Sequence, residues 1–447
     1  MAMRIASKVG MFVLIVVLLA SLLIVACDDD DDTPTPTAAP TPTAAPTPTA
    51  APSPTAAPTP TPTEPVEDVT ITIGNLSDVT GPAANAVGIT DTCMKDLIKY
   101  FNEENLIPGV ELKMQIYDGR LDPSMALGGY EWLLQKDSDF LITVLGLMYI
   151  PILESRLADD EMVLFSLSPP QGILESPPAW SFVMNGPYEA IASSQLKWVA
   201  EHDWDYQANG PAKVGSAGWI GVGTTSMAEA LEAYCTEHPD QFEWVGAFLN
   251  EYSPTWGPEV EGLRDCDYVV PPMTGFAIPS FVKEYRQAGG EAKFLGNDAH
   301  TAEMSLVVQG AGWDRIDGTL VLAFNPWWTE IGEEMVDLTH ELANRYHGSI
   351  EVILEGGAAY TQVVPQYYGV LSIIAETVKR VGPEGLTGRA IRETAESFSM
   401  SYGSVPAWNF TETKRMAWNA FKMYELSASE ENLVEKDPNW YPLSYGP

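Results

Sequence analysis

The chain has 447 residues, with 61 acidic and 24 basic side chains and a formal net charge of −37. This balance excludes a nucleic-acid-binding protein, because such proteins need a basic surface to contact phosphate groups. The length that remains after the first 67 residues is enough for two ordinary domains.

Residues 1–26 are typical of a signal peptide. Two basic residues precede an apolar stretch from Met11 to Ala26, which suits a signal-peptide core and is short for a membrane span. The sequence IVAC at 24–27 resembles the lipobox of bacterial lipoproteins, with Ile24 where Leu is usual. That resemblance implies cleavage before Cys27, lipidation of its sulfur and anchoring to the outer face of the cell membrane. An uncleaved N-terminal helix anchor is the alternative, and both leave the rest of the chain outside the cytoplasm.

Residues 27–67 are predicted to form a disordered stalk. Five aspartates follow Cys27, and a repeat of Pro, Thr and Ala comes next. This composition offers no apolar face to bury, and its prolines favour an extended polyproline II helix that serves as a stiff spacer.

Strand-like and helix-like segments alternate between residues 69 and 166. Branched apolar residues alternate with threonine over 69–73, and apolar residues then recur at helical spacing up to Phe101. Further strands are expected at 111–117, 140–145 and 162–166, with helices at 123–135 and 151–159. The order β-α-β-α-β-α-β predicts a parallel sheet covered by helices on both faces.

A second series of alternating strand-like and helix-like segments follows residue 190. Strands are expected at 212–219, 242–249, 267–270, 293–296 and 318–324, with helices at 225–238 and 278–290. Long helices at 333–347 and 365–382 come next, and strand-like pieces lie near Trp408 and over 417–424. The predicted fold class is therefore α/β, with two Rossmann-like lobes built on parallel sheets.

Several motifs occur in one order along the chain: Thr80-Gly81-Pro82 after the first strand, Asp118 with Asp122-Pro123, MVLFSLSPP at 162–170, KEYRQAGGEAKFLGND at 283–298, and the helix at 365–382. In order and spacing they resemble the substrate-binding proteins of branched-chain amino-acid ABC importers, which have the type I periplasmic-binding-protein fold. The resemblance covers nearly the whole chain after the stalk.

The resemblance implies two lobes joined by three crossing segments, near 184–187, 323–326 and 401–406. The N-terminal lobe would comprise 68–185 and 325–402, and the C-terminal lobe 186–324 and 403–447. Because parallel strands bind ligands beyond their carboxyl ends, the two lobes would share one cleft.

The loops that would face this cleft carry the candidate ligand-binding residues: Asp78, Tyr149, Ser168, Trp219, Met273, Asp298 and Trp327. By the resemblance, Asp298 would hold the ammonium group of a ligand. A helix N-cap is the alternative role, and one carboxylate could serve both. Trp219 and Trp327 would form aromatic walls, although core packing is the alternative for each. The loop SLSPPQG has fewer hydroxyls than amino-acid binders usually have, which argues against a simple aliphatic amino acid as the ligand.

The cysteines of the folded part permit one disulfide. Cys235 ends a helix-like segment and Cys266 precedes a strand in the same region, so an oxidising exterior favours a tentative Cys235–Cys266 pair. Cys93 would remain a small buried residue in a helix.

No motif demands catalysis. The segment GVGTTS lacks the third glycine of a dinucleotide fingerprint, and neither G-x-S-x-G nor H-E-x-x-H occurs. We therefore expect no enzyme, cofactor or metal site. The predicted function is that of a solute-binding lipoprotein of an ABC importer, which passes an amino-acid-like, amide, amphipathic or aromatic ligand to permease and ATPase subunits. A sensory lipoprotein that signals to a membrane receptor or kinase is the alternative, and an enzyme on the same scaffold is the third.

Overall fold

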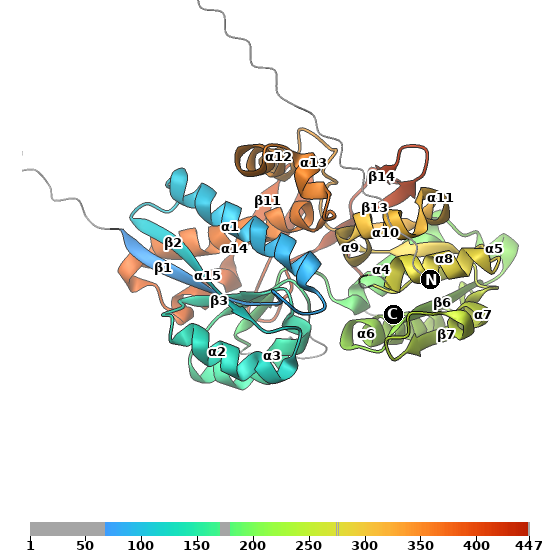
Figure 1. The fold of residues 1–447 in the computed structure, drawn as a ribbon, viewed down its shortest axis with the longest axis horizontal. Helices are drawn as coiled ribbons and strands as arrows, with labels where there is room; N and C mark the ends of the chain where they lie inside the picture. The colour runs from blue at the N-terminus through green and yellow to red at the C-terminus, as the bar shows by residue number, and fades with distance from the viewer. Residues whose placement is uncertain (1–67, 170–178, 274, 276, 446–447) are drawn as a thin grey trace, which may run out of the picture. The chain divides into compact units, whose positions relative to one another are not determined.

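The computed structural model describes residues 68–169, 179–273, 275 and 277–445 (Figure 1). The predicted signal peptide, Cys27 and the stalk lie outside these residues. The part of the chain after Pro62 forms one compact unit. Its strands fall into two large sheets and one small one. In the described part, no helix has both the length and the apolar character needed to cross a membrane.

The first sheet is wholly parallel, with the strand order β2-β1-β3-β4-β5. Its strands are β1 (Val69–Ser77), β2 (Val110–Asp118), β3 (Phe140–Thr143), β4 (Leu164–Ser166) and β5 (Ser181–Val183). The chain runs to one side from β1 to β2 and back past β1 to β3 and β4, so right-handed crossovers place the first helix on one face and the next two on the other. In Figure 1, α1 (Ala84–Glu103) accordingly lies on one face, and α2 (Ala126–Leu134) and α3 (Gly146–Asp159) lie on the other.

The second sheet has the order β14-β13-β10-β9-β8-β6-β7, with β15 paired to β13. Its parallel strands are β6 (Ala212–Trp219), β7 (Phe242–Asn250), β8 (Tyr268–Val270), β9 (Lys293–Gly296) and β10 (Leu320–Ala323). The antiparallel edge comprises β13 (Ala420–Ser427), β14 (Asn432–Glu435) and β15 (Tyr441–Pro442). The α/β class and the two sets of parallel strands confirm the predicted fold.

Each face of the second sheet belongs to a different hydrophobic cluster. Helices α4 (Tyr188–His202) and α6 (Val222–Glu237) contribute to one cluster, together with Val214 and Leu320 of the sheet. Helices α7 (Gly257–Leu263), α8 (Ala277–Gln287) and α10 (Met304–Ala311) contribute to the other cluster, together with Val269 and Val321. Consecutive residues of one strand point to opposite faces, so the sheet separates the two clusters.

This separation corrects the predicted disulfide. Cys235 and Cys266 are both buried free thiols. Cys235 lies on α6 in the first cluster, whereas Cys266 follows α7 and belongs to the second cluster. Because the sheet stands between them, their sulfur atoms cannot reach bonding distance without unfolding the sheet. The prediction of Cys93 as a buried helical residue is confirmed.

A reducing agent should therefore leave the stability of the folded part unchanged. We expect the thermal unfolding midpoint of the full chain to shift by less than about 1 °C on addition of a phosphine reductant, since no disulfide between these cysteines is broken. Differential scanning calorimetry measures this shift. A fall of about 3 °C or more, as the loss of about 2–4 kcal/mol from a broken disulfide would give in a unit of this size, would show that two of the thiols are paired.

The tail of the chain returns to the first sheet. Its helices are α12 (Glu334–His347), α13 (Ile350–Leu354), α14 (Ala359–Val381) and α15 (Gly388–Ser397), and α14 packs along α1 (Figure 1). Helix α14 begins six residues before the predicted start at Pro365, which lies inside the helix. Proline usually begins a helix because it lacks an N–H donor, and this preference made the prediction too short.

The boundaries of the two lobes stay a proposal. The strand pairing indicates that the third segment crossing between the lobes lies later in the chain than predicted. Strand β11 (Ser399–Tyr402) pairs with β12 (Val405–Asn409), and Met416 pairs with Val183 at the end of β5. The two strands of this hairpin stay together, so we propose that the chain crosses to the second sheet after Asn409 rather than over 401–406.

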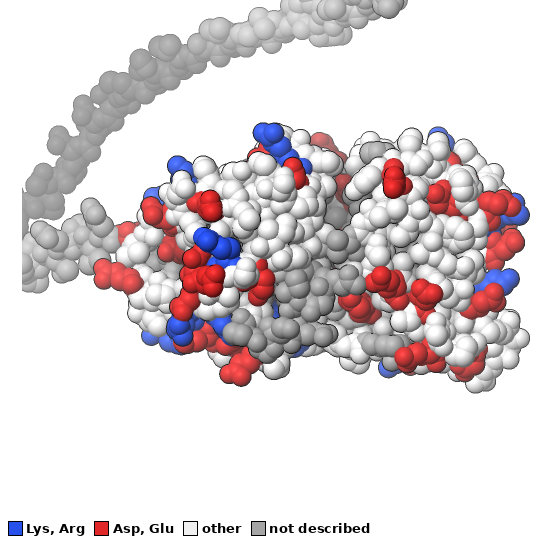
Figure 2. Space-filling model, turned by 90° about the horizontal axis from the view of Figure 1, so that it is seen from below, with Lys and Arg blue, Asp and Glu red and all other residues white. Residues whose placement is uncertain are grey.

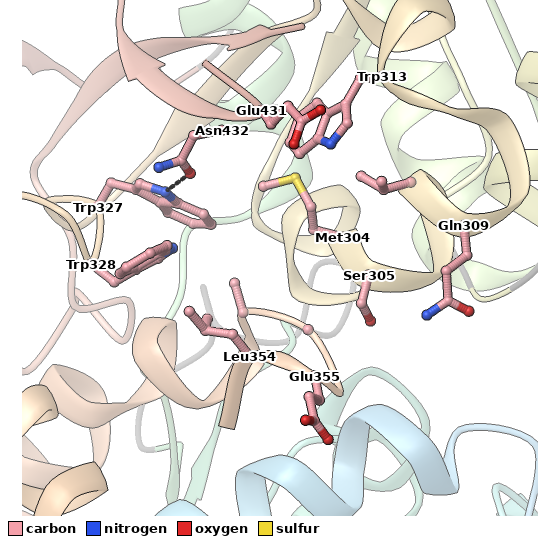
Figure 3. Close-up of a pocket in the computed structure, with 13 residues that line it drawn as sticks. Met304, Ser305, Gln309, Trp313, Trp327, Trp328, Leu354, Glu355, Glu431 and Asn432 are labelled. Atoms are coloured by element: carbon pink, nitrogen blue, oxygen red, sulfur yellow. Dashed lines mark hydrogen bonds between the residues drawn. The ribbon is translucent and has the colours of Figure 1, made fainter. Parts of the chain in front are cut away.

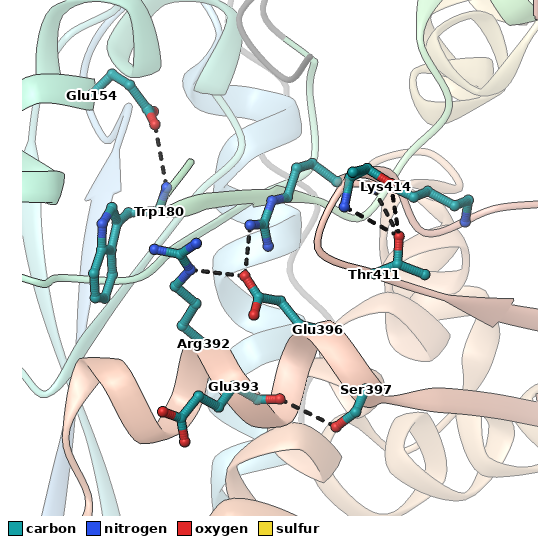
Figure 4. A network of polar contacts seen from close by, with 10 residues as sticks. Glu154, Trp180, Arg392, Glu393, Glu396, Ser397, Thr411 and Lys414 are labelled. Carbon is teal, nitrogen blue, oxygen red and sulfur yellow. Dashed lines mark hydrogen bonds and ion pairs between the residues drawn. The ribbon is translucent and has the colours of Figure 1, made fainter. Parts of the chain in front are cut away.

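A buried ion network fixes this connection to the first sheet. The Arg415 side chain is 1% exposed, and its Nη2 donates to Glu396 Oε1 at 2.7 Å. Arg392 Nε donates to the same oxygen at 2.8 Å, and Figure 4 shows Arg392 and Glu396 facing each other from α15. The Arg415 guanidinium also lies 4.6 Å from the ring centroid of Phe182 in β5. One carboxylate thus joins α15 to the connecting segment.

Candidate functional site

The carboxyl ends of β1 and β2 meet in a loop that two aspartates hold. Asp78 is fully buried, and its two oxygens accept from the N–H groups of Gly81 at 2.6 Å and Ala83 at 2.7 Å. Asp118 accepts from the Thr80 hydroxyl at 2.6 Å. Asp78 lies at the predicted edge, but both oxygens are engaged in shaping the loop.

Tyr149 and Ser168 lie at the same edge of the first sheet. The hydroxyl of Tyr149 contacts Gly119, where a Cβ atom would lie 2.2 Å away, and burial together with nearby aspartates raises the pKa of Tyr149 to about 12. Ser168 Oγ donates to the carbonyl of Val144 at 2.5 Å and accepts from Leu147 N at 3.2 Å. The Ser168 hydroxyl thus ties the loop after β4 to the start of α3.

Asp298 follows β9 as the first residue of the short helix α9 (Asp298–Ala302). Asn297 is the N-cap of this helix and accepts from Ala299 N at 3.0 Å, so the N-cap alternative for Asp298 is wrong. Asp298 Oδ2 is buried without a hydrogen-bond partner among the described residues. Burial raises the pKa of Asp298 to about 7. The carboxyl group therefore lacks the cation that would keep it ionised.

The nearest imidazole cannot supply that cation. His300 Nδ1 accepts from Asn297 N at 3.0 Å, which leaves the proton on Nε2, 3.2 Å from the carbonyl oxygen of Pro271. Burial lowers the pKa of His300 to about 4, so the ring is neutral at pH 7. His300 therefore holds the loop after β8 through a hydrogen bond, and it provides no positive charge to pair with the carboxylate of Asp298.

The loop after β8 is held against α9 at two further points. Asn297 Nδ2 donates to Met273 Sδ at 3.7 Å, and Gly275 N donates to Glu303 Oε2 at 2.5 Å. Burial raises the pKa of Glu303 as well. Met273 and Asp298, which we predicted together, thus lie at one edge of the second sheet.

Helix α14, which packs on α1, also contacts α9. Gln362 Nε2 donates to the carbonyl oxygen of Asp298 at 3.2 Å and to Thr301 Oγ1 at 2.5 Å. Gly357 has φ +122° and lies so close that a Cβ atom would be 2.1 Å from the Ala302 carbonyl oxygen. The layer of the first sheet therefore positions the helix that carries Asp298.

The two predicted tryptophans pack against the second hydrophobic cluster. Trp219 Nε1 donates to Ser253 O at 3.0 Å, and its ring stacks on Trp256 with centroids 6.5 Å apart. Trp327 is 4% exposed, and its Nε1 donates to Asn432 Oδ1 at 2.9 Å. Trp327 lines a separate pocket between α10 and the end of α13. Both indoles therefore have packing partners of their own, as the core-packing alternative expects.

Three residues near Asp298 were absent from the sequence prediction: His300, Glu303 and Gln362. The sequence contained a clue to the role of His300, because a residue three positions after the N-cap Asn297 can complete a capping box. Glu303 lies one turn further along the same segment. Gln362 had no signal, since it lies 64 residues from Asp298 and only the packing of α14 on α9 brings the two together.

The surface bears the acidic excess of the composition. Figure 2 shows acidic side chains spread over both halves of one face, with a furrow between the halves. Within the described residues, no group of three or more His, Cys, Asp or Glu side chains could hold a metal ion.

Comparisons with known proteins agree with this architecture. An ABC-transporter protein for branched-chain amino acids from Thermus thermophilus, with bound valine, superposes with a TM-score of 0.71 at 15% identity and covers 85% of this chain and 97% of its own. A fatty-acid ABC-transporter substrate-binding protein from Thermomonospora curvata gives 0.67 at 13% identity, covering 84% and 93%. A substrate-binding protein from Aeropyrum pernix gives 0.68 at 17% identity, covering 84% and 97%. No curated protein matches the chain.

A family model described as periplasmic binding protein matches residues 70–431, which is most of the chain beyond the predicted stalk. The match agrees with the two parallel sheets and with the predicted resemblance. The chain belongs to the periplasmic binding protein family.

Proposed function

We propose that this chain is a solute-binding protein of an ABC importer that captures a small amphipathic molecule with an ammonium group between its two lobes. The observation that carries the proposal is Asp298, whose Oδ2 atom is buried without a partner among the described residues. A charge-assisted hydrogen bond from an ammonium group would contribute about 1.5–3 kcal/mol there.

The opposite end of such a ligand would meet the first sheet. The N–H groups of Leu147, Met148 and Tyr149 in the first turn of α3 are already engaged, by Ser168 Oγ and by the carbonyl oxygen of Leu145. The buried hydroxyl of Tyr149 has no hydrogen-bond partner among the described residues, so it can donate to a carboxylate or carbonyl oxygen of the ligand. The hydroxyl of Ser168 and both oxygens of Asp78 are already engaged. Of the predicted residues at this edge, Tyr149 is thus the one whose side chain is left to donate, which supports a ligand with a larger apolar part than a simple aliphatic amino acid.

Membership of a family of solute-binding proteins supports import rather than catalysis. Two structural relatives carry branched-chain amino acids or fatty acids in their descriptions, and both are ABC-transporter proteins. We further propose that the chain is exported, anchored through a lipid on Cys27, and passes its ligand to permease and ATPase subunits. Replacement of Cys27 by Ser would then release the protein from the membrane fraction.

A thermal-shift screen of the full chain tests the proposal. The probes are amino acids with aliphatic and aromatic side chains, aliphatic amides, aryl-alkyl amines and short-chain fatty acids. A ligand at 100 times its Kd should stabilise the protein by about 2.7 kcal/mol. We expect the largest shifts from ammonium-bearing aromatic or amphipathic compounds. Shifts from fatty acids alone would contradict the assigned role of Asp298.

A further inference from the structure

We propose that the chain has a second ligand site, a tryptophan-lined pocket that binds a small organic cation of the quaternary ammonium class. The pocket has a volume of about 640 Å³, and Asp298 is not among the residues that line it. Its lining includes Met304, Trp313, Trp327, Trp328, Glu355 and Glu431.

The walls of the pocket come from both layers of the molecule. Helix α10 and the turn between β13 and β14 belong to the second sheet, whereas the end of α13 and the start of α14 belong to the tail that packs on the first. Figure 3 shows Trp327 and Trp328 on one side, Met304 and Trp313 on the other, and Leu354 below them. The volume falls in the range of about 300–1,000 Å³ that is usual for small-molecule sites.

The aromatic wall is held in place before any ligand arrives. Trp327 is fixed by the bond from its indole N–H to Asn432, and its ring centroid lies 6.5 Å from that of Trp328 at an interplanar angle of 52°. His340 Nε2 lies 2.8 Å from the Trp328 carbonyl oxygen, and its ring lies 6.3 Å from the Trp328 ring. Two tilted indole faces on a rigid segment suit a cation, because the face of an indole is the strongest cation–π acceptor among side chains.

Charge complementarity selects a cation over a neutral apolar molecule. Glu355 and Glu431 are the charged residues in the described lining, which contains no Lys or Arg. Both glutamates are exposed and lie on opposite walls, one at the end of α13 and the other in the turn before β14. A cation bound in the pocket against the tryptophan wall would therefore meet negative potential from two sides, whereas an anion would be repelled.

Titration calorimetry of the full chain in an uncharged maltoside detergent tests the proposal, with choline as the cation and 3,3-dimethylbutan-1-ol as its neutral isostere. We expect saturable choline binding with a change in tryptophan emission, and at least tenfold weaker binding of the alcohol. Equal binding of the two would overturn the proposal, because it would show that charge plays no part. Absence of saturable binding by choline, tetramethylammonium and phenyltrimethylammonium would also overturn it.

Variants locate the site. Trp328→Leu should weaken choline binding at least tenfold, and the double variant Glu355→Gln, Glu431→Gln about fivefold. Glu351→Gln, one turn earlier on α13 and outside the lining, should leave the affinity unchanged, and circular dichroism should show all variants folded. Choline binding that disappears in Asp298→Asn and persists in Trp328→Leu would place the cation at the other site and contradict this proposal, while leaving the proposed function intact.

Discussion

Replacing Asp298 with Asn is expected to weaken the binding of an ammonium-bearing ligand about 10- to 100-fold while stabilising the ligand-free protein at pH 8. The first effect follows from the loss of a charge-assisted hydrogen bond worth about 1.5–3 kcal/mol. The second follows because the Oδ2 atom has no partner among the described residues and its charge is costly to bury. Titration calorimetry gives the affinity, and urea denaturation gives the free energy of unfolding.

The pH dependence has a definite sign. The pKa of Asp298 is raised from 3.8 to about 7 in the folded protein, so the folded state binds a proton that the unfolded state has lost between these values. The contribution of Asp298 to stability is full below pH 3.8 and is lost as pH rises through 7. The advantage of the Asn variant should therefore grow between pH 5 and 7, by about 1.4 kcal/mol per pH unit at most, and level off by pH 8.

Asp240→Asn, an exposed acid before β7, serves as the matched control and should show neither effect. Parallel stability curves of wild type and Asp298→Asn across this pH range would show that the carboxyl group is not isolated in the folded state. Ligand binding to wild type should also release a proton near pH 6, since the carboxyl group must ionise to pair with an ammonium. Calorimetry in buffers of different ionisation enthalpy detects this proton.

Replacing Glu396 with Ala is expected to destabilise the protein by about 3–5 kcal/mol. The substitution leaves the buried guanidinium of Arg415 without its carboxylate, and breaking one side of a buried ion pair costs about this much. Arg415→Met should cost less, because it removes the buried charge and leaves Glu396 paired with Arg392 at 2.8 Å. Urea denaturation of the three proteins checks this order.

The control is Glu393→Ala on the same helix. Glu393 pairs with Arg380 at 3.0 Å in an exposed setting, so its loss should cost less than about 1 kcal/mol. Burial opposes ionisation of Glu396, but the hydrogen bonds from Arg415 and Arg392 outweigh it and lower the pKa of Glu396 below 4.5. Its contribution is therefore present above pH 4.5 and lost as pH falls through the lower folded value. Similar losses for Glu393→Ala and Glu396→Ala would contradict the network.

The sequence predicted the alternation of strands and helices well, because long segments carry clear periodicity. The missed elements include the helices α4 and α15, of 15 and 10 residues, and several short segments, such as the three-residue strand β5 and the five-residue helices α9 and α13. The short segments are too brief to show a period of 2 or 3.6 residues. Pro365 misled the prediction of a helix start, since helix α14 tolerates this proline six residues after its start at Ala359.

The disulfide error has a topological cause. The chain passes from β6 outward to β7 and then back beyond β6 to β8, so right-handed crossovers place α6 and α7 on opposite faces of the sheet. Cys235 follows one helix to its face and Cys266 follows the other. Strand order is set by pairing between segments far apart in the chain, and the local sequence carries no trace of it.

The candidate site was predictable only in part, for the same reason. The sequence pointed to Asp298 as a candidate because it follows a recognisable strand and falls within a motif. Its isolation in the fold depends on burial by residues distant in sequence, and its support by Gln362 depends on the return of α14. For Trp327, the sequence does not reveal that its indole N–H donates to Asn432, 105 residues away.

The three buried thiols give this protein intrinsic reporters of its internal order. Burial raises the pKa of Cys93 well above 9, and that of Cys235 and Cys266 to about 12, so an alkylating reagent meets little thiolate in the native state. Cys93 on α1 and Cys235 on α6 belong to one hydrophobic cluster, beside the first and the second sheet respectively, and Cys266 belongs to the other cluster. The order in which the three cysteines become alkylated in mild denaturant would therefore show which region opens first.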